Sequence, residues 1–233
     1  MGLLARIPGL WFSPRETSAE VVRDPKPWLA LVAVVLLNLA FTVIWMQKVD
    51  PVEFMKIQNE ESGALDKVEP DQRASIVETQ AKAFPIFAWL GPVVFIPAIL
   101  LLVSFLQWLI FRFGYSAAVS FKQSLGIVGH VSIAVGVITT PLILLVLYLK
   151  GDWNMNPTEA IGANLALLLD RGSSAKWLYH LAASVDLFAL WSIFLTAVGY
   201  GIAAKRPTSS AFWGVLAPYV AWVIAVAAWK AMF

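Results

Sequence analysis

The chain has 233 residues, of which 59% are hydrophobic and only 14% charged, a composition too apolar for an ordinary soluble domain. Its formal net charge of +2 argues against a broad basic surface for nucleic acid, so no nucleic-acid partner is predicted. The absence of cysteine and the presence of only two histidines exclude disulfides, thiolate chemistry and a histidine-rich metal site. We therefore predict no metal and no cofactor.

Residues 1–27 are predicted to form a short amphipathic segment on the cytoplasmic side. Ser13-Pro14-Arg15-Glu16 has the form of a capping box, which predicts a helix that runs to about Arg23 before Asp24-Pro25 ends it. Ahead of this helix, apolar and aromatic side chains are mixed with Arg6. Two interpretations are open: the segment lies at the lipid interface with its aromatic side chains at headgroup depth, or it packs on the helix bundle.

Residues 28–233 are predicted to form one domain of five transmembrane helices. Residues 83–111 contain no charged side chain and exceed the roughly 20 residues that a helix needs to cross a bilayer core of about 30 Å. Continuous apolar runs of this length indicate helices, because lipid leaves backbone groups no other partner. The fold class is therefore all-α, a polytopic membrane protein with a bundle of five transmembrane helices and a short amphipathic N-terminal helix. The predicted spans are about 28–46, 83–111, 124–149, 181–204 and 211–229.

The first loop, residues 47–82, is predicted to be an acidic helical hairpin outside the cytoplasm. Asp50-Pro51-Val52-Glu53 caps one helix, and Glu69-Pro70-Asp71 opens another that runs toward the second span. Lys and Arg are densest, relative to acids, in the N-terminal segment and in the second and fourth loops. By the positive-inside rule this places the N-terminus in the cytoplasm and the C-terminus outside.

Asp186 is the only charged side chain within a predicted span and is a candidate binding residue. A carboxylate at that depth costs a few kcal/mol unless it faces water or the bundle interior. It is either functional or a hydrated structural carboxylate near the outer end of its helix. His130 lies near the cytoplasmic end of the third span, so a direct bond between Asp186 and His130 is not expected.

Gln107 and Asn38 are the remaining candidate binding residues. Gln107 lies at a depth that favours a buried hydrogen bond to His130, and Asn38 lies in the middle of the first span, where amides commonly join helices. The second span also contains three prolines, which free backbone carbonyls and favour a kink. The prolines are Pro85, Pro92 and Pro97.

Small side chains recur every four residues on three of the predicted helices. Such faces let helices pack closely, either within the monomer or against a partner or a second copy of the chain. The faces are Ser132, Gly136 and Thr140; Ala197 and Gly201; and Ala217, Ala221 and Ala225. Nucleophile motifs, phosphate-binding loops and paired intramembrane carboxylates are missing from the sequence, so no catalytic residue and no enzyme activity are predicted.

Four short motifs resemble bacterial Yip1-domain proteins, and the resemblance extends over nearly the whole chain. It implies five spans with a cytoplasmic N-terminus. Eukaryotic relatives are Golgi and endoplasmic-reticulum proteins that associate with Rab GTPases and act in vesicle traffic. Their N-terminal cytoplasmic region is much longer and carries an Asp-Leu-Tyr-Gly-Pro motif, which this chain lacks. The motifs are Leu10-Trp11-Phe12-Ser13-Pro14, Asp24-Pro25-Lys26-Pro27-Trp28, Phe121-Lys122-Gln123-Ser124-Leu125 and Leu187-Phe188-Ala189-Leu190-Trp191.

Two hypotheses for function follow. The first is a non-enzymatic Yip1-like protein of the bacterial inner membrane that scaffolds or organises membrane or partner proteins. The alternative is a small transporter, channel or lipid-moving protein with a cavity near Asp186 and the proline-kinked second span. Beyond the lipid bilayer, the expected partners are a membrane protein or a second copy of the chain, bound through the small-residue faces.

Overall fold

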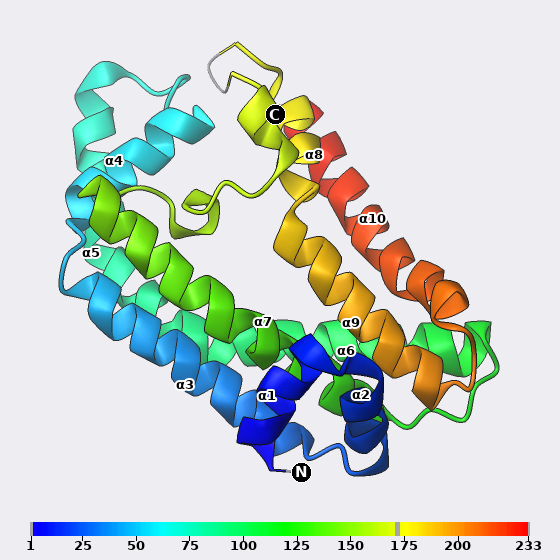
Figure 1. Cartoon of the computed structure of the whole chain (residues 1–233). Helices are drawn as coiled ribbons and strands as arrows, with labels where there is room; N and C mark the ends of the chain where they lie inside the picture. Colours follow the sequence, from blue (N-terminus) through cyan, green and yellow to red (C-terminus); the bar gives the residue numbers. More distant parts are fainter. Residues whose placement is uncertain (1, 171–172, 233) are drawn as a thin grey trace. The chain divides into compact units, whose positions relative to one another are not determined.

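The computed structural model describes residues 2–170 and 173–232, and most of these lie in helices (Figure 1). The chain divides into two compact units, which we describe separately. The first unit comprises Met1–Val34, Ala98–Val137 and Gly162–Phe233. The second unit comprises Val35–Pro97 and Ile138–Ile161. The long helices α3 (Pro27–Met46) and α7 (Phe121–Lys150) each contribute residues to both units.

The first unit is built around α9 (Leu187–Ala203), which lies against α10 (Thr208–Met232) and against the N-terminal helix α2 (Pro14–Arg23) (Figure 1). The C-terminal half of α9, from Leu195 to Gly201, is buried because both of its neighbours cover it, and this arrangement brings α2 into the core. The buried core consists of Val21, Phe111, Ala117, Val119, Ile127, Ile193, Ala197, Tyr200, Ala211 and Val215.

The remaining helices of the first unit are shorter or interrupted. α1 (Leu3–Phe12) precedes α2, and α6 (Ile96–Leu109) ends in a π-helical turn, η2 (Ile110–Gly114). α8 (Lys176–Ser184) packs against α10 and against the 3₁₀ turn η4 (Leu165–Leu168).

The second unit has an aromatic core. It contains α4 (Pro51–Ser62), α5 (Pro70–Leu90), the π-helical turn η1 (Gly91–Phe95) and the 3₁₀ turn η3 (Pro157–Glu159). The Trp45 ring lies 5.2 Å from that of Phe54 and 5.5 Å from that of Phe84 between centroids. Its indole Nε1 donates to the carbonyl of Trp153 at 2.9 Å, so the one polar atom of this ring is satisfied.

The predicted hairpin over residues 47–82 is helical, as expected. The Asp50 carboxylate caps α4 by accepting from the amides of Val52 at 2.9 Å and Glu53 at 3.2 Å. Gly63 ends α4 in the left-handed conformation, with a φ of 67°. α5 begins at Pro70 and continues through η1 and α6, so that a single helical segment of 45 residues, Pro70–Gly114, contains the second predicted span.

The structure supports four of the five predicted spans as continuous helices of spanning length. Four helices in the described residues are long and apolar enough to cross a membrane: Pro27–Met46, Pro70–Gly114, Phe121–Lys150 and Thr208–Met232. The expected fourth span, 181–204, is divided into α8 and α9, and the 17 residues of α9 extend only about 25 Å. The protein is therefore an integral membrane protein with four candidate spans, and α9 is a shorter apolar helix.

Candidate functional site

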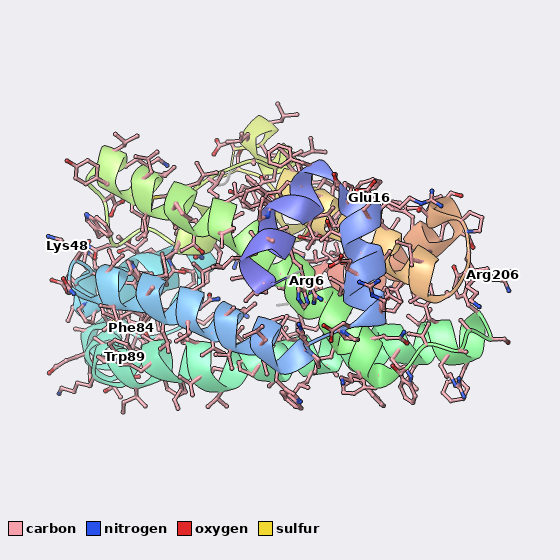
Figure 2. All side chains as sticks on the ribbon, turned by 60° about the horizontal axis from the view of Figure 1, so that its bottom comes forward. Arg6, Glu16, Lys48, Phe84, Trp89 and Arg206 are labelled. Carbon is pink, nitrogen blue, oxygen red and sulfur yellow. The ribbon has the colours of Figure 1, made fainter. Side chains whose placement is uncertain are left out.

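The N-terminal segment is fixed to the first unit by a buried arginine. Arg6 on α1 is only 1% exposed, and its guanidinium lies among the helices rather than on the surface (Figure 2). Its Nη1 donates to the backbone carbonyl of Asp24 at 2.9 Å, and its Nη2 lies 3.5 Å from the Asp24 carboxylate. Burying a charged guanidinium costs its hydration energy, so an arginine is buried only when partners such as these replace its water.

His130 on α7 completes this polar cluster, which we define as Arg6, Asp24 and His130. The His130 Nδ1 lies 2.8 Å from the carbonyl of Gly126 and must carry the proton, because a carbonyl can only accept. The Nε2 is then the acceptor for Arg6 Nη1 at 3.2 Å. The imidazole is therefore neutral and joins α7 to the N-terminal segment.

Asp24 lies at the exposed edge of the polar cluster. Lys26 lies 2.9 Å from its carboxylate, and this hydrogen bond, with the charges of Lys26 and Arg6, lowers the pKa of Asp24 below its usual range despite partial desolvation. The carboxylate remains ionised at neutral pH and faces two cations. This arrangement holds the turn between α2 and α3 in place.

Two further contacts settle how α1 lies. Trp11 Nε1 donates to the carbonyl of Ala134 on α7 at 2.9 Å, and Leu10 is 2% exposed. This face of α1 therefore packs against α7 in the first unit. Leu4 and Phe12 remain exposed, so contact of the other face with lipid stays a prediction. The predicted capping box is wrong in one detail. Ser13 lies directly before α2, but its side chain forms no hydrogen bond to the first amides of the helix.

The expected hydrogen bond between Gln107 and His130 is wrong. Gln107 Nε2 donates instead to the carbonyl of Val215 on α10 at 3.2 Å, and its Oε1 has no partner among the described residues. Both ring nitrogens of His130 are already bound to Arg6 and Gly126. Arg6 could not be assigned to His130 from the sequence, because 124 positions separate them.

Asp186 is not inside a helix, contrary to the prediction. It is the residue before α9, and its Oδ1 accepts from the amides of Phe188 and Ala189, both at 2.9 Å. The backbone on either side of Asp186, where α8 and α9 are separated, pairs with the preceding loop. The amide of Leu187 donates to the carbonyl of Ala163 at 2.9 Å. Asp186 thus supplies the partner that the first amides of α9 lack, which is a structural role.

Asn38 lies half-buried on α3, and its carbonyl accepts from the hydroxyl of Thr42 at 3.0 Å. The structure places Asp186 at the start of α9, Gln107 against α10 and His130 against α1. These candidate residues therefore bind their own neighbours and do not converge on one another. No group of three His, Cys, Asp or Glu side chains that could hold a metal ion occurs in the described part of the chain.

A second buried polar contact joins three helices and was missed by sequence reasoning. The hydroxyls of Ser124 and Tyr200 are hydrogen-bonded to each other, and Ser124 Oγ also donates to the carbonyl of Ser104 at 2.5 Å. Tyr200 is fully buried and stacks on Phe111 with 4.2 Å between ring centroids. Single hydroxyl groups in apolar runs give no sequence signal of their partners.

The family of the chain follows from a comparison over nearly its whole length. A sequence model of the Yip1 domain matches residues 9–229. The chain belongs to the Yip1 domain family. Searches of curated proteins and of solved structures found no match to it. The matched region begins within α1 and includes Asp24 and His130, so most of the polar cluster lies inside the Yip1 domain.

Proposed function

We propose that this Yip1-domain protein is a non-enzymatic scaffold that organises membrane or partner proteins. The observation that carries the proposal is that three of the candidate polar side chains each bind a neighbouring helix or helix end inside the first unit. His130 has both nitrogens occupied, Asp186 caps α9, and Gln107 binds the α10 backbone. Side chains that would serve a reaction or a transport pathway instead hold helices together. Membership of a family that is generally non-enzymatic supports the same assignment.

We propose the bacterial inner membrane as the location, with the N-terminus in the cytoplasm and the C-terminus outside. The distribution of basic residues supports this orientation. The contact of α2 with α9 near the Lys205–Arg206 turn is consistent with this orientation. The basic N-terminal segment and the basic turn then lie on the same side of the membrane.

The proposed partner surface is the small-residue face of α10. Ala217, Ala221 and Ala225 are exposed, whereas Ala197 and Gly201 of the corresponding α9 face are buried inside the first unit. A helix from a partner or a second copy can approach closely only where side chains are small. The α10 face therefore supports an intermolecular contact, and the α9 face an intramolecular one.

Photo-crosslinking in native membranes tests this proposal. A photoreactive residue at Ala221 is expected to give a discrete protein adduct, while the same residue at exposed Trp222, about 100° around the helix, gives mainly lipid adducts. An adduct of twice the chain mass identifies a homo-oligomer. With the photoreactive residue at Ala217, the substitution Ala221→Leu should abolish the adduct. Equal labelling from positions 221 and 222, insensitive to Ala221→Leu, contradicts the proposal.

One observation favours the alternative of a transporter, channel or lipid-moving protein. The α5–α6 segment changes to a π-helical turn at Gly91–Phe95, which contains Pro92, and such turns occur frequently at functional sites. Transport across a reconstituted membrane separates the two functions.

A further inference from the structure

A basic groove lies in the first unit between α2 and the turn that joins α9 to α10. Its volume is about 500 Å³, and the residues that matter to its chemistry are Arg15, Ala19, Gly201, Lys205, Arg206 and Thr208. Arg206 lies at the outer end of this turn (Figure 2). The groove is separate from the polar cluster around Arg6.

The local sequence explains the shape of the groove. Arg15 and Ala19 are one turn apart on the same face of α2, and the small Ala19 side chain leaves depth beside the arginine. Lys205 ends α9 in the left-handed conformation, with a φ of 53°. The amide of Arg206 then bonds back to the carbonyl of Gly201 at 2.8 Å. This reversal brings Arg206 and the first residue of α10 back over α9.

No acid among the described residues forms an ion pair with the basic side chains of the groove. Arg15, Lys205 and Arg206 form no ion pair within the described residues, whereas Arg6, Arg23 and Lys26 each lie within 4.0 Å of an acid. The neighbouring acid Glu16 is exposed on α2 and does not line the groove. Three unpaired cations from two elements therefore face one concave surface.

This arrangement matches a phosphate-bearing anion. Guanidinium groups bind phosphate oxygens with paired N–H donors, and a lysine ammonium adds a compact charge. The groove lies where the apolar helix α9 ends and the candidate span α10 begins, which is the depth of lipid headgroups. We propose that the groove binds the phosphate of an anionic phospholipid headgroup. This inference goes beyond the scaffolding role and does not depend on it.

Native mass spectrometry of the full chain, with short-chain phosphatidylglycerol as the probe, tests this inference. The wild type should retain this lipid in preference to short-chain phosphatidylcholine. The variant Arg15→Gln/Arg206→Gln should bind it about thirtyfold more weakly, roughly fivefold for each base removed. The matched control Arg112→Gln/Lys122→Gln removes the same charge from two exposed positions outside the groove and should change binding less than about twofold, because salt screens charges that do not contact the lipid.

The phosphate bound in the groove could come from a lipid headgroup or from free inorganic phosphate. Competition with inorganic phosphate distinguishes these two sources. Binding of phosphate to the wild type without retention of phosphatidylglycerol would overturn the lipid assignment. Equal weakening by the groove variant and its control, or equal retention of both lipids, would overturn the site itself. If the double variant does not fold, the single substitution Lys205→Gln at the exposed turn replaces it, with Lys122→Gln as control.

Discussion

Replacing Arg6 with methionine should release the N-terminal segment from the first unit and lower the free energy of unfolding by about 1–3 kcal/mol. Methionine keeps most of the aliphatic volume, so the loss arises from hydrogen bonds rather than from a cavity. The substitution removes the donor to His130 Nε2 and both contacts to Asp24. A buried acceptor left without a donor costs its full desolvation energy.

Hydrogen exchange measured by mass spectrometry checks this prediction. Amides of α1 and α2 should exchange faster in Arg6→Met, while those of α10 change little. The matched control is Arg23→Met, because the Arg23 side chain is 77% exposed and its pair with Glu20 at 3.7 Å contributes little. Unchanged exchange over residues 3–23 in Arg6→Met would show that the buried arginine does not hold the segment.

Gly126→Ala should destabilise the same region by overpacking. A Cβ at Gly126 would lie 2.6 Å from Pro25 Cβ and 2.9 Å from the Pro25 carbonyl oxygen, and this backbone can yield only by moving away from α7. The shift displaces the adjacent Asp24, whose carbonyl accepts from Arg6. We expect a loss of about 1–3 kcal/mol, typical of an added methyl group in a packed core.

Thermal or denaturant unfolding of Gly126→Ala in detergent gives the size of the loss, with Gly114→Ala as the matched control. A Cβ at Gly114 meets no atom within 4 Å, so the same added methyl group should have little effect there. If the two alanine variants unfold alike, the close approach of α7 to the α2–α3 turn does not determine stability.

The apolar runs predicted most of the helices because hydrophobic length is a property of the local sequence. α3, α7 and α10 begin and end within a few residues of their predicted spans, and the Asp50 cap occurs as expected. The second span was also correctly expected to continue from the helix that opens at Pro70.

Hydropathy did not predict that the helix expected over residues 181–204 is interrupted at Asp186. Residues 181–204 are apolar on both sides of the aspartate, so a window average joins α8 to α9. An aspartate followed by an apolar run is equally the signature of a helix N-terminus, and the loop backbone at Ala163 satisfies the interrupted amides. The helix cap formed by the half-buried Asp186, rather than hydrophobic length, decided the structure here.

The partners of the polar candidates could not be predicted because they depend on long-range packing. Depth in the bilayer made Gln107 the expected partner of His130, but depth says nothing about which helix faces which. In the sequence, Arg6 is only a charge in an apolar segment, and its burial requires the fold that brings α1 onto α7. The sequence gives one signal that α1 packs on another helix: the cation Arg6 is flanked by large apolar side chains.

Flux across liposomes containing the purified protein is the measurement that tests the scaffolding account most directly. Asp186→Asn is the informative variant, because asparagine caps a helix as well as aspartate does while removing the charge. We expect that ion, solute and lipid movement stays at the level of protein-free liposomes for both the wild type and Asp186→Asn. Flux through the wild type that Asp186→Asn abolishes, with the variant folded, would contradict the scaffold and establish transport.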